Sequence, residues 1–158
     1  MFIRNSYDFT EFLTYRKELD KIAGWDTSLE EITQEYESLC RKRHIWWLPL
    51  TDHGKDIGFI VVGTHPECHA QADYFIINAY IKPAYRRKHL MTRYVRKFVE
   101  SHPGIYCLDI INKNVAAKAF WRKTFRSMGY KPYQLPEIPG RLSGDCTAYG
   151  WRKWNGKS

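Results

Sequence analysis

AYIKPAYRRKHLMTR, residues 79–93, predicts the end of an apolar strand, a short basic loop and the first turn of a helix. At a helix start, free backbone N–H groups and the positive end of the helix dipole point the same way, which suits phosphate groups. Four consecutive residues, 86–89, can carry positive charge there, although the dipole by itself favours acids. A bound anion would remove this conflict, whereas a solvated helix face is the alternative that needs no ligand. We therefore expect a phosphate site between this strand and this helix.

Composition narrows the class of protein. Apolar residues make up 44% of the 158 residues and aromatic residues 16%, so we expect residues 1–158 to form a single domain with its own core. No apolar run approaches the roughly 20 residues of a membrane helix, and the N-terminus lacks a signal peptide's apolar segment. The four cysteines form no CxxC pair, which favours reduced thiols and a cytoplasmic protein. HPECH, residues 65–69, is interpreted as a hairpin loop, and no metal site is expected.

The charge is divided unevenly along the chain. Residues 1–81 carry 8 basic and 13 acidic residues, a net charge of −5, whereas residues 82–158 carry 17 and 4, a net charge of +13. A basic half indicates a polyanionic ligand, either nucleic acid or a phosphorylated cofactor. An acidic half favours a cationic ligand if it faces one, and two solvated surfaces of opposite charge are the plain alternative.

Periodicity predicts an α/β chain in a particular order. Two amphipathic helices come first, each opening with a capping-box pattern at Asp8 or Ser28. Three strands with short links then suggest an antiparallel meander. Helix, strand and helix follow, a βαβ pattern that implies parallel pairing beside the meander. The expected helices span residues 8–23, 28–43, 86–100 and 115–128, and the expected strands span 44–50, 57–64, 73–81, 105–111 and 146–151, with a loop over 133–144.

A second informative stretch, NKNVAAKAFWRKTFRSMGY, covers residues 112–130. Asn114 can cap the helix with its side-chain oxygen. The small side chain of Ala117 would let a linear ligand lie close to the helix. Phe120 and Trp121, taken alone, are interpreted as core residues, and Gly129 is a helix stop.

Together these two stretches make the chain resemble the GNAT superfamily of N-acetyltransferases over nearly its whole length. The N-x-x-A-x-x-F-[YW] helix ending in Gly-aromatic is the most specific part of the resemblance. Arg86 takes the first position of the family's [RQ]-x-x-G-x-[GA] loop. His89 and Met91 stand where the family has glycine and then glycine or alanine, and Trp121 stands where it often has tyrosine.

The resemblance implies an α/β (α+β) fold with a mixed, mostly antiparallel sheet of about six to seven strands flanked by about four helices. The sheet would splay beside the strand at residues 73–81, with acetyl-CoA (coenzyme A) bound in the splay as co-substrate and no metal. The implied cofactor-binding residues are Ala79, Ile81, Arg86, Arg87, Lys88, His89, Leu90, Met91, Asn114, Ala117, Phe120 and Lys123.

The implied reaction is direct transfer of an acetyl group to a primary amine. A lysine-like ammonium has a pKa of about 10.4, so it must lose a proton before it attacks. The implied catalytic residues are Asn78, which could position a proton-accepting water, Tyr80, and Ile81, whose N–H would polarise the thioester carbonyl. Tyr80, Cys107 and Tyr130 are the candidates for protonating the leaving thiolate in place of the family's tyrosine.

The amine acceptor is expected between the early helices and the loops that follow them. Acids and aromatic residues there suit a cationic amine through ion pairs and cation–π contacts. A polyamine, an amine small molecule, or a protein lysine or N-terminus would all fit. Solvated acids and core tryptophans are the alternative. The residues concerned are Trp25, Asp26, Glu30, Glu31, Trp46 and Trp47.

Two other classes of function remain open. His89, Met91 and Trp121 depart from the family's residues, which favours a catalytically weak or inactive GNAT-like module that binds acyl-CoA or a protein. Basic residues around Trp151 and Trp154 would suit nucleic acid, but no nucleic-acid motif is present, so we rank this third. We expect no membrane partner, and a homodimer paired through the last strand is compatible with the sequence.

Overall fold

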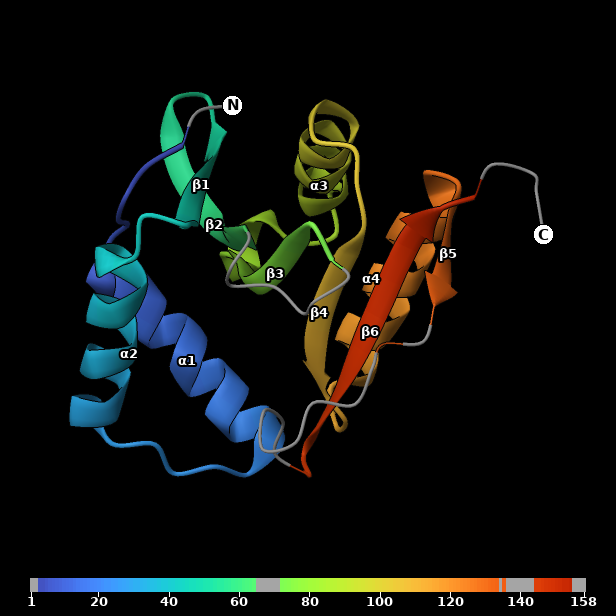
Figure 1. The fold of residues 1–158 in the computed structure, drawn as a ribbon. Coiled ribbons are helices and arrows are strands. Elements are labelled where there is room, and N and C mark those ends of the chain that lie inside the picture. The colour runs from blue at the N-terminus through green and yellow to red at the C-terminus, as the bar shows by residue number, and fades with distance from the viewer. Residues whose placement is uncertain (1–2, 65–71, 134, 136–143, 155–158) are drawn as a thin grey trace.

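Six strands and four α-helices make up the described part of the computed structural model, which covers residues 3–64, 72–133, 135 and 144–154 (Figure 1). The number of strands and helices agrees with the sequence-based expectation. The elements in chain order are α1 (Phe9–Ala23), α2 (Leu29–Arg41), β1 (Ile45–Asp52), β2 (Lys55–Thr64), β3 (Tyr74–Ile81), the 3₁₀ helix η1 (Pro83–Tyr85), α3 (Leu90–Ser101), β4 (Tyr106–Ile111), α4 (Val115–Ser127), β5 (Tyr130–Tyr133) and β6 (Cys146–Lys153).

The strands form one mixed sheet in the order β1-β2-β3-β4-β6-β5. The meander β1-β2-β3 is antiparallel, β3 pairs with β4 in parallel, and β6 pairs antiparallel with both β4 and β5. The parallel pair follows from the helical crossover through α3, because a parallel neighbour cannot be reached by a tight turn. The expected mostly antiparallel sheet is therefore confirmed.

The parallel pair in the middle of the sheet is short. β3 and β4 pair only from Tyr74 with Tyr106 to Ile76 with Leu108. Both strands continue beyond this point, and Figure 1 shows them diverging. The sheet therefore opens between the carboxyl halves of β3 and β4, which is the splay that the sequence predicts.

A β-bulge lies in β3 where the two strands separate. Val62 pairs with Ile76 and the preceding Val61 pairs with Asn78, so Ile77 is an extra residue opposite β2. Bulges bend a strand and increase its twist, which favours the divergence from β4. Ile77 and Asn78 consequently both face α1 and α2, while Ala79 faces α3 and α4.

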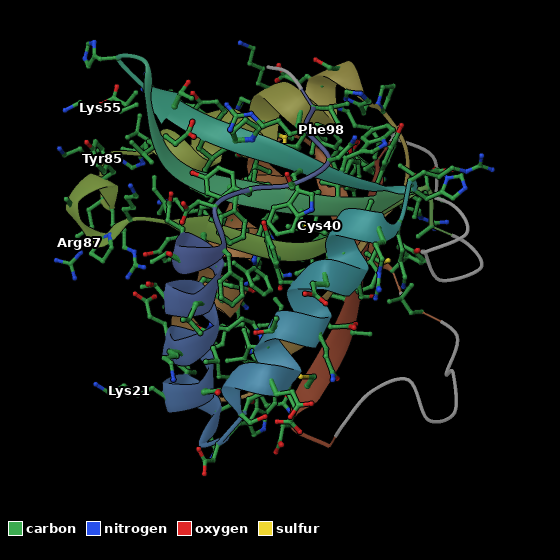
Figure 2. All side chains as sticks on the ribbon, turned by 90° about the vertical axis from the view of Figure 1, so that its left-hand side faces the viewer. Lys21, Cys40, Lys55, Tyr85, Arg87 and Phe98 are labelled. Atoms are coloured by element: carbon green, nitrogen blue, oxygen red, sulfur yellow. The ribbon has the colours of Figure 1, made fainter. Side chains whose placement is uncertain are left out.

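Helices cover both faces of the sheet. α1 and α2 pack on one face around a cluster that includes Phe12, Trp47 and Phe59, and Figure 2 shows these two helices side by side. α3 and α4 cover the other face around Phe98 and Phe125. The two faces of the sheet thus carry separate main cores.

Local signals set most helix ends as expected. The Asp8 side chain accepts a hydrogen bond from the Glu11 N–H, and Ser28 and Glu31 form a reciprocal capping box. Asn114 caps α4 by accepting from the Ala117 N–H at 3.1 Å. Gly24 and Gly129 adopt left-handed φ values of 76° and 80° just after their helices.

Two expectations about the elements were wrong. The helix expected from residue 86 begins at Leu90, because Arg87 and His89 have φ values of 64° and 58°, outside the helical region. Strand β5 was not predicted, because its four residues show no alternation and include Pro132, and its last residue, Tyr133, was expected in a loop. Proline fits there because β5 is at the edge of the sheet.

Among the described residues, no helix has the length and apolar character needed to cross a membrane. Within the same residues, Cys40 is a free thiol. The HPECH segment, residues 65–69, lies outside the described residues.

Candidate active site

A cavity of about 530 Å³, here called the α3-side cavity, lies where the end of β3, the following loop, α1, α3 and α4 meet. Eleven of the residues named from the sequence line it, together with Tyr15, Glu18 and Trp121. These eleven are Ala79, Tyr80, Ile81, Arg86, Arg87, His89, Leu90, Met91, Asn114, Ala117 and Phe120. The two stretches singled out in the sequence therefore come together in space.

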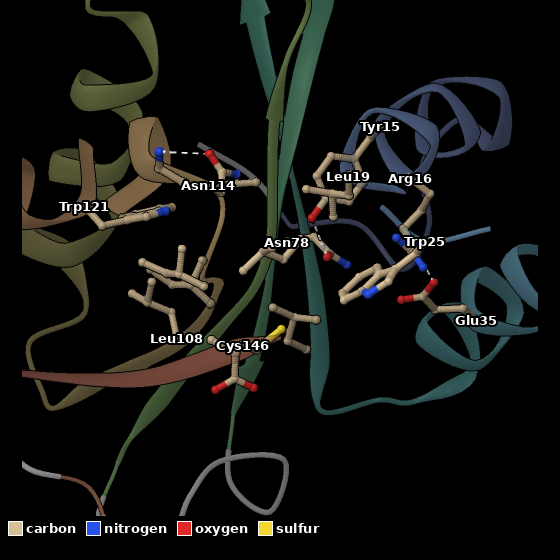
Figure 3. Close-up of a pocket in the computed structure, with 17 residues that line it drawn as sticks. Tyr15, Arg16, Leu19, Trp25, Glu35, Asn78, Leu108, Asn114, Trp121 and Cys146 are labelled. Atoms are coloured by element: carbon tan, nitrogen blue, oxygen red, sulfur yellow. Dashed lines mark hydrogen bonds and ion pairs between the residues drawn. The ribbon is translucent and has the colours of Figure 1, made fainter. Parts of the chain in front are cut away.

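A second cavity of about 240 Å³, here called the α2-side cavity, lies on the other side of the splay (Figure 3). Its walls include Arg16, Trp25, Glu35 and Asn78. Both cavities are lined by Tyr15, Leu19, Ala79, Asn114, Ala117 and Trp121. The two cavities therefore meet at the opening between β3 and β4, so that ligands entering from opposite sides can make contact.

The edge of β3 at this meeting point offers backbone groups. The Lys82 N–H donates to the Ile57 carbonyl at 2.8 Å, on the β2 side. Successive residues of a strand direct their backbone groups to alternate edges, so those of Ala79 and Ile81 face the edge that β4 has left. The Arg86 Nε donates to the Ile81 carbonyl at 2.9 Å from that edge, which agrees with this assignment. An extended ligand can pair here as an additional strand would.

The loop between η1 and α3 contains two residues that have a left-handed backbone conformation although neither is glycine. Arg87 (φ 64°) and His89 (φ 58°) adopt a backbone conformation that glycine enters most easily. His89 is also the N-cap residue of α3, and it makes no side-chain cap hydrogen bond. The expectation that this position would have an ordinary helix-start conformation was wrong. The backbone of this loop therefore has a conformation that favours glycine, although the residue at position 89 is histidine.

The cations of this loop are arranged unequally. The Arg86 guanidinium forms an ion pair with Glu18 of α1 at 2.8 Å, across the α3-side cavity. Arg87 and His89 are exposed and line the cavity, and Figure 2 shows Arg87 at the periphery of the molecule. Lys88 lies 5.7 Å from the centre of the Tyr85 ring and does not line the cavity. An anion that enters this cavity would meet Arg86, which is already paired with Glu18, and the exposed Arg87.

Asn78 has a fixed position in the α2-side cavity. Its Oδ1 accepts a hydrogen bond from the Tyr15 hydroxyl at 2.6 Å. Its Nδ2 is buried and has no hydrogen-bond partner among the described residues. In Figure 3, the amide nitrogen of Asn78 is directed away from Tyr15 and toward Trp25.

An anionic network stands beside Asn78. The buried Arg16 is bound by Glu35 at 2.6 Å and by Asp20 at 3.5 Å. Burial by itself lowers the pKa of Arg16, but the two carboxylates outweigh it and the net direction is upward, so Arg16 stays charged. One cation facing two carboxylates leaves this network with a net negative charge, and Arg16 and Glu35 are its members at the cavity wall. Trp25, whose Nε1 donates to Asp145 at 2.9 Å, adds an aromatic surface.

Tyr80 and Trp121 are aromatic residues that line the α3-side cavity. Tyr80 packs against Tyr15 with ring centroids 5.8 Å apart, and burial raises the pKa of its hydroxyl. Trp121 reaches both cavities from α4, opposite Tyr15. Cys107 and Tyr130, the other two candidates for a proton donor, line neither cavity.

Some residues suggested by the sequence lie elsewhere. Lys123 lines neither cavity. Trp47 is fully buried in the core under α1 and α2, and Trp46 packs against Tyr74 and Phe98 on the opposite face. Of the three tryptophans expected at the acceptor site, only Trp25 lines the α2-side cavity.

Sequence reasoning missed Tyr15 and Glu18, which both line the α3-side cavity. Tyr15 follows Phe12 by three positions and precedes Leu19 by four, so helical spacing could have placed it on the buried face. Glu18 carried no comparable signal, because an acid on an amphipathic helix is usually solvated.

A sequence profile of the Acetyltransferase (GNAT) family matches residues 9–125, which is most of the chain. The chain therefore belongs to the GNAT acetyltransferase family. A comparison with curated protein sequences finds no match.

Solved structures share the fold at low sequence identity. An acetyltransferase from Thermus thermophilus is 16% identical with a TM-score of 0.63, over 90% of this chain and 86% of that chain. The aminoglycoside antibiotic 6'-N-acetyltransferase AAC(6')-IG from Acinetobacter haemolyticus is 20% identical with a TM-score of 0.57, over 90% of this chain and 97% of that chain. The PaiA N-acetyltransferase from Thermoplasma acidophilum, solved with coenzyme A, is 16% identical with a TM-score of 0.55, over 97% of this chain and 98% of that chain.

Proposed function

We propose that residues 1–158 form one acetyltransferase domain that transfers the acetyl group of acetyl-CoA directly to a primary, cationic amine. The observation that carries the proposal is the open edge of β3, which lies at the junction of a cavity with a cationic mouth and a cavity with an anionic wall. Family membership supports the same reaction class.

The α3-side cavity suits coenzyme A in size and in donor groups. Its volume of about 530 Å³ is within the range of small-molecule sites. The N–H groups of Ala79 and Ile81 would hold the amide-containing arm, and the Ile81 N–H would polarise the thioester carbonyl. The amides of residues 87–91 would bind the diphosphate, with Arg86, Arg87 and Lys88 adding charge. Asn114, Ala117 and Phe120 would lie along the arm.

The α2-side cavity suits the amine. Acetyl-CoA supplies the activated acetyl group as a thioester, and the residues of this chain hold the nitrogen against it. The net negative wall of Arg16, Glu35 and Asp20 would attract an ammonium group, and Trp25 would give it an aromatic face. Fixing both reactants at the shared opening would supply much of the rate. We keep Asn78 and Tyr80 as the residues beside the transferred proton.

The test measures binding and chemistry separately. Calorimetry with acetyl-CoA should give a saturable signal, and CoA thiol should be released when primary amines are added. Arg86→Ala should weaken CoA binding, whereas Arg122→Ala, an equally basic change on the exposed side of α4, should not. No CoA binding at millimolar concentration would overturn the proposal.

A second candidate function is favoured by Trp121. An indole has no labile proton to give a leaving thiolate, and Trp121 occupies the wall where both cavities meet. The chain would then be a GNAT-like acyl-CoA-binding or protein-interaction module. Saturable CoA binding with no thiol release from any amine would favour this function over catalysis.

A further inference from the structure

The amide of Asn78 carries a buried hydrogen-bond donor at a cavity wall. The residue is 8% exposed, and its Nδ2 has no hydrogen-bond partner among the described residues. Its orientation is fixed by Tyr15, because turning the amide over would leave the buried Tyr15 hydroxyl without the oxygen to which it donates. Buried donors are almost always paired in folded proteins, so an unpaired one at a cavity wall indicates a ligand.

The backbone aims this donor at the acceptor side of the splay. The bulge at Ile77 places Asn78 on the α1 and α2 face, whereas its neighbour Ala79 offers its backbone edge to the cofactor side. Consecutive residues of a strand are about 3.3 Å apart. An oxygen held by Asn78 and a nitrogen reacting beside Ala79 would therefore belong to one small molecule, a few bonds apart.

The charge of the same wall decides which oxygen fits. Arg16 is already bound by Glu35 and Asp20, and Asp109 of β4 faces the cavity from the other side. A carboxylate on the ligand would meet Glu35 and Asp109 at the cavity wall, and the one cation there is already neutralised. A hydroxyl, an ether or an amide carbonyl carries no such penalty.

We propose that the acceptor is a primary amine with a neutral oxygen close to the nitrogen, an amino amide or amino alcohol, and that Asn78 selects it through Nδ2. The inference rests on the proposed acetyl transfer. Asn78 would therefore favour amino amides and amino alcohols over polyamines and alkylamines, which lack the oxygen. It would also favour them over amino acids, whose carboxylate oxygens are charged.

The experiment compares acceptors of matched size by CoA thiol release. 2-Methoxyethylamine and glycinamide carry the oxygen, butylamine replaces the ether oxygen by a methylene group, and glycine carries a carboxylate instead. The ratio of kcat/KM for 2-methoxyethylamine, whose oxygen only accepts hydrogen bonds, over butylamine is measured in the wild type and in Asn78→Asp. Asn78→Asp keeps an oxygen for Tyr15 but removes the donor. Comparing the two ratios cancels the intrinsic basicity of the amines.

We expect the ratio to fall by about three- to tenfold in Asn78→Asp, which is the value of one hydrogen bond. Tyr15→Phe removes the hydroxyl that orients the amide but keeps Nδ2, so it should lower the ratio less than Asn78→Asp does. Equal ratios in wild type and Asn78→Asp, or an equal loss for every amine, would overturn the inference while leaving acetyl transfer intact. Absent CoA binding would instead overturn the proposed function. If CoA binds without turnover, the ratio of amine dissociation constants measured with CoA present decides in the same way.

Discussion

Replacing His89 by glycine tests whether the cationic loop is held in a strained conformation. His89 has a φ of 58° and a ψ of 18°, and its side chain is exposed, so little packing is lost on removal. A left-handed conformation costs an L-residue about 1–2 kcal/mol. Glycine adopts this conformation without that cost, but it lowers the stability of the folded state by about 0.4–1 kcal/mol because it gives the unfolded chain more conformational entropy. The difference predicts that His89→Gly is more stable by about 0.5–1 kcal/mol.

For a domain of this size, that gain corresponds to a rise in Tm of about 1–4 °C. His53 is the matched control, because it also has a positive φ, 50°, in the β1–β2 turn and lines neither cavity. His53→Gly should raise Tm by a similar amount and leave CoA affinity unchanged. Met91→Gly should lower Tm, since Met91 is helical and packs against the α3 and α4 core.

Thermal unfolding of the three variants measures the stability change, and calorimetry with CoA measures the affinity. His89→Gly should bind CoA more tightly if the histidine side chain obstructs the diphosphate, and Met91→Gly reports on the same site with the opposite effect on stability. A lower Tm for His89→Gly together with a higher Tm for His53→Gly would refute the strain argument.

Three further predictions concern the ion pair, the core and the buried tyrosines. Glu18→Gln should tighten CoA binding about two- to fivefold in calorimetry, because it frees Arg86 from a half-exposed ion pair, and the exposed Glu30→Gln should change nothing. Phe125→Ala should cost about 3–5 kcal/mol in chemical denaturation because Phe125 is fully buried, and the half-exposed Trp154→Ala should cost far less. Burial raises the pKa of Tyr36 to about 12 and also raises those of Tyr15 and Tyr106 above the unfolded value of 10.0. The folded state therefore keeps these hydroxyls neutral, so stability should be complete below about pH 10 and decline as the pH rises from there toward the native values. A denaturation midpoint that stays constant from pH 8 to 12 would contradict this.

The parts of the fold that depend on neighbouring residues could be predicted from the sequence. Ser28, Asn114 and Gly129 act within one helical turn, so their caps are visible as local patterns. The crossover through α3 likewise follows from the order of strands and helices.

Features that depend on pairing between distant residues could not be predicted. The bulge at Ile77 exists only relative to Val61 and Val62. The bond between Tyr15 and Asn78 joins residues 63 positions apart. His89 has a left-handed conformation because the chain must turn there from η1 into α3. A histidine in the sequence does not by itself predict that conformation.

The residues that line the α3-side cavity could be named from the sequence more fully than those that line the α2-side cavity. A motif with fixed spacing led to Arg86 and Asn114. The acceptor half was suggested by composition alone, and composition cannot say which face a tryptophan takes. Trp25 lies at the cavity, but Trp47 is in the core.

The extra residue in β3, Ile77, affects the opening in the sheet but not the overall fold. Removing Ile77 would leave Ile76 opposite Val62 and Asn78 opposite Val61, so every later side chain would keep its present face. The strand would become regular, and β3 could remain beside β4 along its full length. Such a single-residue deletion should give a closed sheet with both cores intact and no passage between them. The connection between the two cavities would then depend on one inserted isoleucine, which itself lines the α2-side cavity.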